Sequence, residues 1–388
     1  NGLINRASCV RQTSDGGFII GGGTYEGIWI IKINSNGNIL WQKTYGNGNV
    51  YSIHEITNGH YIVAGLFAEG RSTDALVMEL DNNGNVVWLK TYKAKDDQVA
   101  KSIQQTSDGG YIVGGYVYGG GQHDIWISKL DAMGNIVWQK EYGDGSWHES
   151  YGVQETIDGG YISVGDVLLK LDNNGNIVWQ KQCASCESIY KTSDNAYIIG
   201  GYKEGPFYYD EYSWILKVDD FGNVIWGKTY NGRRGDYERV NSIIQAADGG
   251  YVGAGFISKL NTSESDMFVL KIDPSGGIPG CDKIEELNTI GPTTALFAHD
   301  TNAFIQSTPV TVINTNTTPK NSSARISAYC CYSNEETDTD GDDIDDVCDN
   351  CPANANAGQA DGDDDGVGDV CDACLYDPEN DADDDGVC

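Results

Sequence analysis

The last part of the chain carries aspartates at a spacing that suits metal coordination. Three segments place Asp at alternating positions, namely 338, 340 and 342, then 361, 363 and 365, and then 381, 383 and 385. Alternation within a tight, glycine-bearing loop directs three carboxylates toward one point. Hard cations bind six to eight oxygen ligands of this kind, and Ca²⁺ tolerates irregular geometry better than Mg²⁺ does. We therefore expect this tail to bind several Ca²⁺ ions.

The ends of these segments separate them from an EF-hand loop. The bidentate Glu of an EF-hand is absent, and Gly-Asp-x-Cys-Asp-x-Cys follows instead. With CDNCP at 348–352, this ending makes residues 338–388 closely resemble thrombospondin type 3 repeats. In that family the repeats have little regular secondary structure and wrap around rows of calcium ions. The resemblance implies the ligands Asp338, Asp340, Asp342, Asp346, Asp349, Asp361, Asp363, Asp365, Asp369, Asp372, Asp381, Asp383 and Asp385.

The match to this family has two departures and one alternative. The first unit has Asp343 and Ile344 where the family prefers glycine, and the third unit stops at Cys388 before its motif is complete. A disordered acidic tail would explain the charge but not the regular Cys and Gly spacing. Without calcium we expect disorder, because nothing except disulfides opposes the mutual repulsion of the carboxylates.

Eleven cysteines, most of them clustered, indicate an oxidising compartment. The thrombospondin-like pairing implies Cys351–Cys371 and Cys374–Cys388, because disulfides join successive units in that family. Cys183 and Cys186 have redox C-x-x-C spacing, for which we favour a structural local bridge. The remaining residues are Cys281 and Cys348, which would take Cys330 and Cys331 in either order, and Cys9, which is free or bonded to another chain.

Charge and hydropathy argue against a nucleic-acid partner and against a membrane-spanning segment. The net charge is −32, and residues 335–388 hold 21 acidic residues and no Lys or Arg, which leaves −11 for the remainder (36 acidic against 25 basic residues). Phosphate binding needs basic patches, so we expect no nucleic-acid partner. No stretch approaches 18 apolar residues, so we expect no membrane span. Sequons at Asn261, Asn316 and Asn321 fit a glycosylated extracellular or cell-surface protein, processed or partial at Asn1.

Two short patterns alternate through the first 280 residues. One is a turn such as DGGY, with copies at 15, 58, 108, 158, 194 and 248. The other is a turn followed by Trp, as in LDNNGNIVWQK, with tryptophans 41 to 50 residues apart at Trp41, Trp88, Trp138, Trp179 and Trp226. A sixth copy, KIDPSGGIPGC, lacks the Trp. We expect these tryptophans to pack between repeats, with sugar stacking as the alternative.

Self-similarity at this period predicts an all-β repeat architecture. In the third unit, SIQQT, YIVGGYVY, DIWISKLD and IVWQKEYG read as strands separated by Gly- and Asn-containing turns. Such a unit cannot bury both faces alone, so the repeats predict a β-propeller of about six four-stranded blades in domain 1–281, with a seventh possible. Residues 8–281 resemble the tandem propeller repeats of secreted bacterial and archaeal proteins.

Residues 282–334 form a polar Thr/Asn-rich connector that keeps some strand alternation in PVTVINT and ARISAY. One reading is a linker with one or two strands that complete the last blade. The other is an extended strand that pairs with the exposed edge of a neighbouring subunit. Both readings keep 335–388 as a separate calcium-binding, disulfide-linked tail.

Evidence for catalysis is thin. The turn-and-Trp pattern resembles quinone-dependent dehydrogenase propellers, which also have a vicinal cysteine pair, but Cys330–Cys331 lies beyond the blades. The five histidines show no zinc-binding spacing, and we find no nucleophile elbow. We expect no enzyme. An extracellular structural or adhesive protein is favoured, with a protein or glycan partner at the cell surface and a homopolymer through the connector or tail as an option. A lectin-like propeller is the alternative, followed by an enzyme acting on polysaccharide or a quinone-linked substrate.

Overall fold

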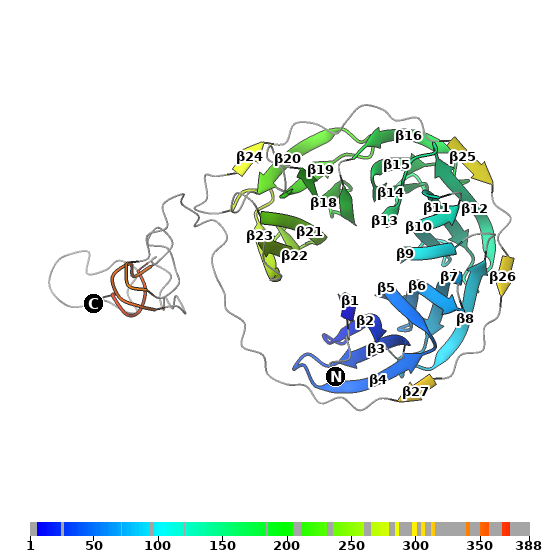
Figure 1. The fold of residues 1–388 in the computed structure, drawn as a ribbon, viewed down its shortest axis with the longest axis horizontal. Helices are drawn as coiled ribbons and strands as arrows, with labels where there is room; N and C mark the ends of the chain where they lie inside the picture. Colours follow the sequence, from blue (N-terminus) through cyan, green and yellow to red (C-terminus); the bar gives the residue numbers. More distant parts are fainter. Residues whose placement is uncertain are drawn as a thin grey trace.

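A computed structural model describes the propeller and parts of the tail (Figure 1). It describes residues 6–278, apart from gaps at 25–26, 71, 94–96, 120, 184, 205–210, 231–235 and 260–264. Beyond residue 278 it describes 284–286, 297–300, 304–306, 312–314, 339–341, 350–356 and 367–372. Within these residues there is no helix, and so none long and apolar enough to span a membrane.

Six antiparallel units are arranged as the blades of a β-propeller (Figure 1). Blade 1 consists of β1 (Arg6–Gln12), β2 (Phe18–Thr24), β3 (Gly27–Ile33) and β4 (Ile39–Tyr45). Blade 2 consists of β5 (Gly48–Glu55), β6 (Tyr61–Glu69), β7 (Ser72–Leu80) and β8 (Val86–Lys93). Blade 3 consists of β9 (Asp97–Gln105), β10 (Tyr111–Gly119), β11 (Gln122–Leu130) and β12 (Ile136–Gly143).

The second half continues the same order of strands. Blade 4 consists of β13 (Ser150–Glu155), β14 (Tyr161–Gly165), β15 (Val167–Leu171) and β16 (Ile177–Gln182). Blade 5 consists of β17 (Cys186–Lys191), β18 (Tyr197–Glu204), β19 (Glu211–Val218) and β20 (Val224–Tyr230). Blade 6 consists of β21 (Asp236–Gln245), β22 (Tyr251–Lys259) and β23 (Ser265–Ile272). The strands read from the third repeat are thus confirmed, although β9 begins five residues before SIQQT. Only three strands of blade 6 are described, not the four expected.

Five hydrophobic cores lie between successive blades. Each combines one face of a blade with the opposite face of the next, as in the core that joins Ile28 and Tyr45 of blade 1 to Val63 and Met78 of blade 2. These side chains are fully buried. Because both faces of an inner blade are covered, its third strand reads as a continuous apolar run rather than an alternation.

The repeated tryptophans pack between blades, as expected. Each lies against the aromatic residue that follows the DGG-type turn of the next blade, with ring centroids 5.7 to 6.2 Å apart in the pairs Trp41–Tyr61, Trp88–Tyr111, Trp138–Tyr161 and Trp226–Tyr251. Trp179 packs against the core that contains Tyr197. Each tilted ring pair at this distance contributes roughly 0.5–1.5 kcal/mol of stability beyond that from the surface area it buries.

The connector adds strands to the propeller's own blades. Its strands β24 (Ile284–Glu286), β25 (Phe297–Asp300), β26 (Phe304–Gln306) and β27 (Val312–Asn314) pair antiparallel with the outer strands of blades 5, 3, 2 and 1 respectively (Figure 1). This belt therefore returns around the outside of the ring in the reverse order. None of these four strands pairs with blade 6, so the described part of the connector does not complete the last blade as expected. Pairing with a neighbouring subunit stays a prediction, because ARISAY and most of the connector lie outside the described residues.

Candidate interaction face

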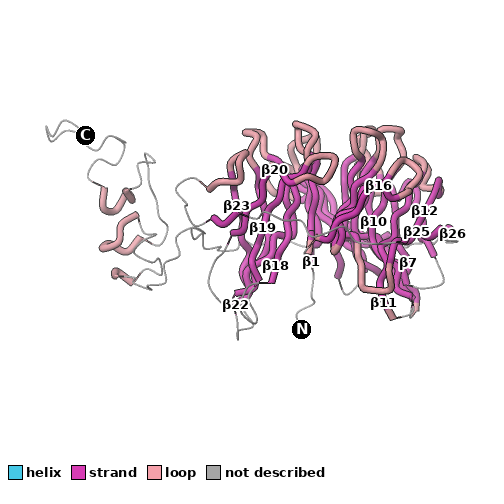
Figure 2. The backbone as a smooth tube through the Cα atoms, turned by 90° about the horizontal axis from the view of Figure 1, so that it is seen from above, coloured by secondary structure: helices cyan, strands magenta, loops and turns pink. Residues whose placement is uncertain are grey.

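The two faces of the propeller differ in regularity. On one, which we call the turn face, every turn between first and second strands, and between third and fourth strands, has five residues (Figure 2, upper edge). On the other, the variable face, the connections range from one residue between β14 and β15 to six between β12 and β13 and between β18 and β19. Functional residues concentrate on loops that a rigid scaffold positions, so the variable face is the candidate interaction face.

Every inner strand contains a β-bulge at the same place. In β9, Ser102 pairs with Gly114 and Ala100 with Gly115, so Lys101 is left out of the ladder. A bulge of this kind re-aims one side chain out of the sheet. The corresponding residues of blades 1 to 6, which we call the bulge ring, are Ser8, Tyr51, Lys101, Tyr151, Glu187 and Asn241.

Bulge-ring residues from neighbouring blades interact with one another. The Lys101 ammonium lies 4.3 Å from the centre of the Tyr51 ring and 5.5 Å from that of Tyr116. Burial lowers the pKa of Lys101, while Glu149 and Glu187 oppose this shift. The charges therefore converge on the inner strands of blades 3 to 5, where a polar ligand would meet a cation, several carboxylates and aromatic rings.

Glu187 has the most strongly perturbed carboxylate of this group. Burial raises its pKa to about 7, an effect that Asp166 and Glu149 reinforce and that Arg239 and Lys101 oppose. Arg239 is itself held by two hydrogen bonds to Glu211, of 2.6 and 2.8 Å. Carboxylates with a perturbed pKa cluster at functional sites, so Glu187 is a functional-site candidate.

Blade 3 carries an aromatic cluster, defined as Tyr116, Tyr118, His123 and Trp147, at the variable face. The His123 ring stacks on Tyr116 at 4.3 Å between centroids, meets Tyr118 edge-on at 5.3 Å and lies 4.1 Å from Trp147. The side chains of Trp147 and Tyr118 are 56 and 41 % exposed. His123 Nδ1 also lies 2.5 Å from Glu149 Oε1, which links the cluster to the bulge-ring charges.

Local hydrogen bonds fix the loop that presents Trp147. The Asp144 carboxylate accepts a hydrogen bond from the backbone N–H of Ser146 at 2.9 Å and lies 3.0 Å from His148 Nε2. The backbone N–H of His148 donates to the His123 carbonyl at 2.8 Å. The exposed indole is therefore held on an ordered loop, which suits recognition because little conformational entropy is left to lose on binding.

Sequence reasoning missed both features. A bulge arises from a one-residue register shift, which composition does not reveal, although each of the six residues does precede a Ser, Gly or Cys. Trp147 does not belong to the repeated Trp positions, and this irregularity in the sequence could have identified it as a candidate binding residue. Of the histidines, His60 contacts Glu79 at 2.6 Å, while burial, followed by Arg11, lowers the pKa of His54 to about 3.

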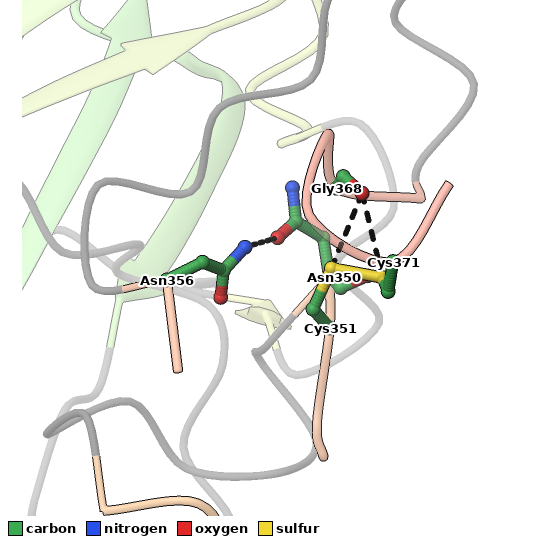
Figure 3. Close-up of a disulfide and its surroundings, with 5 residues drawn as sticks. All are labelled: Asn350, Cys351, Asn356, Gly368 and Cys371. Atoms are coloured by element: carbon green, nitrogen blue, oxygen red, sulfur yellow. Dashed lines mark hydrogen bonds between the residues drawn. A yellow bond between two sulfur atoms is a disulfide. The ribbon is translucent and has the colours of Figure 1, made fainter. Parts of the chain in front are cut away.

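The described part of the tail holds the expected disulfide between Cys351 and Cys371 (Figure 3). The backbone N–H of Gly368 donates to the Asn350 carbonyl at 2.9 Å, and Asn356 donates to the Asn350 side chain at 2.7 Å. A Cβ on Gly368 would lie 2.4 Å from Asn350 Oδ1, so a larger residue there would force the Asn350 side chain to move. Cys183 and Cys186 form the expected local bridge, and Cys9 is free.

Most of the predicted calcium ligands lie outside the described residues. Asp340, Asp369 and Asp372 are described, and the described parts of the chain contain no group of three His, Cys, Asp or Glu residues able to hold a metal ion. The donor chemistry of the predicted set, all carboxylate, fits a hard cation. The sequons at Asn261, Asn316 and Asn321, and the cysteines Cys281, Cys330, Cys331, Cys348, Cys374 and Cys388, also lie outside the described residues.

Comparisons with known proteins add little beyond the architecture. No family model matches the chain, and no curated protein does. Among solved structures it is similar to the WD40 domain of Neurospora crassa Pan2, at 12 % identity and a TM-score of 0.44, over 70 % of this chain and 84 % of that one. Sqt1 from Chaetomium thermophilum is 9 % identical with a TM-score of 0.35, over 71 and 87 % of the two chains. Similarities this low do not bear on function.

Proposed function

We propose that this chain is an extracellular interaction module whose propeller binds a surface partner through its variable face. The observation that carries the proposal is the aromatic cluster, where exposed Trp147 and Tyr118 surround His123 beside Glu149. Trp and Tyr are enriched at binding hot spots, and an ordered loop lowers the entropic cost of association. The cysteine-rich composition and the disulfides at Cys183–Cys186 and Cys351–Cys371 support an oxidising, extracellular setting.

A carbohydrate partner is the more specific candidate, because exposed aromatic rings adjoin carboxylates in this face. A pyranose presents an apolar face that stacks on Trp or Tyr, and its hydroxyls donate to acceptors such as Glu149 and Glu187. A protein partner would use the same aromatic anchors without the need for the neighbouring carboxylates. The proposal is of a binding module and assigns no reaction to the chain.

Binding to a glycan array and to intact cells tests this proposal. Trp147→Ala should abolish or strongly weaken binding, because it removes the exposed anchor while leaving the inter-blade cores untouched. Phe221→Ala is the matched control, since Phe221 is an aromatic residue 73 % exposed on the turn face. Equal loss of binding in both variants, or in neither, would contradict a site at the aromatic cluster.

For the tail we propose a Ca²⁺-stiffened spacer that holds the propeller away from its point of attachment. The alternating aspartates at 361, 363 and 365, the Cys351–Cys371 bridge and the resemblance to thrombospondin type 3 repeats support this role. Calorimetric titration with Ca²⁺ should show several sites. A variant with these three aspartates changed to asparagine should lose part of the stoichiometry, whereas Asp74→Asn in the propeller should not.

Assembly into a fibre through the belt or tail is a separate option. Electron microscopy in millimolar calcium and in chelator distinguishes the outcomes. Filaments that fall apart on chelation would make the tail a calcium-dependent joint between copies. Single propellers in both conditions would leave the tail as a spacer and rule out calcium-driven assembly.

A further inference from the structure

The ring of blades is interrupted between blade 6 and blade 1 (Figure 1). The five described inter-blade cores join blades 1 to 6 in succession, and none joins blade 6 to blade 1. We call this interruption the seam. Its two sides are the outward-facing side of β23 on blade 6 and the first two strands of blade 1.

Blade 6 exposes apolar side chains that other blades bury. Met267 and Val269 on β23 are 92 and 71 % exposed, whereas the corresponding Ala75 and Val77 on β7 are fully buried against the next blade. The repeated lysine shows the same difference: Lys271 is 48 % exposed and Lys129 only 5 %. Exposed apolar residues gathered on one strand mark an interaction surface.

Blade 1 lacks the contact between a turn glycine and a tryptophan that blades 2 to 6 share. In each of blades 2 to 6, a Cβ placed on the turn glycine would lie 2.7 or 2.8 Å from the Trp of the preceding blade, at Gly84, Gly134, Gly175, Gly222 and Gly276. Gly37 occupies the same place in blade 1, and no atom of the described residues lies within 4 Å of that position. Phe18 and Ile20, which match the buried Tyr61 and Val63, are only half-buried.

The structure assigns to the seam one specific occupant: a further four-stranded unit of the same repeat, with its own Trp. The five existing interfaces show what such a unit would supply. Its fourth strand would place a Trp on Gly37 and a Tyr hydroxyl within reach of the Gly37 carbonyl, as Tyr45 reaches Gly84 at 2.8 Å. Its first two strands would cover Met267 and Val269, as β9 and β10 cover Val77.

Methionine oxidation reports directly on the seam. The chain has three methionines: Met78 is fully buried, Met133 is 71 % exposed on the turn face, and Met267 lies in the seam. With dilute peroxide and mass spectrometry, Met267 in the full chain should oxidise at least as fast as Met133. Protection of Met267 at every concentration would mean that the chain's own residues fill the seam. Protection that appears only with dimerisation would mean that a second copy does. Either result overturns the proposal.

A fusion tests the occupant itself. Residues 47–93, which hold blade 2, are placed ahead of Asn1, so that the added Trp can reach Gly37. We expect Met267 to lose its reactivity while Met133 keeps it, and the midpoint of thermal unfolding to rise. The control carries Trp88→Ala in the added copy only, and should protect Met267 less.

A second fusion guards against an added unit that fails to fold in this context. It uses residues 94–143, which hold blade 3, in the same position. Protection of Met267 by either fusion, weakened by loss of the added Trp, supports the proposal. If neither unit protects Met267, the seam does not accept a repeat of this pattern.

Discussion

Lys271 and Asp248 form an ion pair at 2.6 Å on blade 6, and the lysine side chain is 48 % exposed. The same pair recurs as Lys129–Asp108 at 2.9 Å on blade 3, where the lysine is only 5 % exposed. The difference arises because blade 4 covers Lys129, while no described residue covers Lys271 in the same way. The two pairs therefore compare the same type of contact with and without a neighbouring blade.

Replacing these lysines should give very different losses of stability. Lys129→Met removes hydrogen bonds from a buried ammonium to the Asp108 carboxylate and to the Leu130 carbonyl, and should cost about 1.5–3 kcal/mol. Lys271→Met should cost much less, because solvent screens its pair with Asp248. The midpoints of denaturant unfolding compare the two, and equal shifts would contradict the role given to the neighbouring blade.

Gly134 and Gly37 provide a second matched comparison. Both adopt positive φ, of 73° and 79°, so alanine is strained at either position by about 1–2 kcal/mol. Only at Gly134 would the new Cβ also lie 2.7 Å from Trp88. Gly134→Ala should therefore lower the unfolding midpoint more than Gly37→Ala does. If a further unit covers the seam, the two variants should become equally destabilised.

The pKa of Glu187 predicts a pH dependence of stability. Its pKa in the folded protein, about 7, lies above its ordinary value, so the folded state binds a proton that the unfolded state does not. This group therefore adds stability as the pH falls from about 7 toward 4.5. Glu187→Gln should stabilise the protein at pH 8 and flatten the dependence over that window. Exposed Glu204→Gln is the control and should leave the slope unchanged.

Asp108 and Asp158 predict the opposite behaviour in acid. Burial acts to raise the pKa of each, but hydrogen bonds from Thr106 and Lys129, or from Thr156 and Lys170, outweigh it and lower the pKa to about 2. The ionised forms stabilise the fold above the ordinary carboxyl pKa, and this contribution is lost as the pH falls from about 4 to 2. NMR titration of the two carboxyls checks it, and ordinary midpoints would refute these hydrogen bonds.

Cys9 should react slowly despite being a free thiol. Burial raises its pKa to about 12, and its Sγ contacts the Gly21 carbonyl at 3.6 Å within the core between blades 1 and 2. The thiolate is the reactive species, so alkylation at pH 8 should be far slower than that of a free cysteine, and denaturant should accelerate it. Rapid labelling of the folded protein would show that β1 opens readily.

Much of the fold follows from the local pattern. The five-residue turns fix hairpin register, as at Asp131, whose carboxylate accepts the backbone N–H groups of Met133 and Asn135. The glycine in each turn supplies the positive φ, and the apolar runs between turns become strands. The period of the repeated Trp indicated a series of similar units, and these units must stack because a single unit cannot bury both of its faces. The resemblance of the tail to thrombospondin type 3 repeats likewise implied the Cys351–Cys371 bridge.

Three features were decided only by tertiary structure. The belt strands β24 to β27 are only three or four residues long, and they form because the outer strands of blades 5, 3, 2 and 1 offer unpaired backbone groups to them. The bulge ring depends on inter-strand register, which is a relation between segments and not a property of one. The seam is defined by the exposure of Met267 and Gly37. Whether one unit buries another cannot be predicted from the sequence of either unit, because burial depends on how the two units pack.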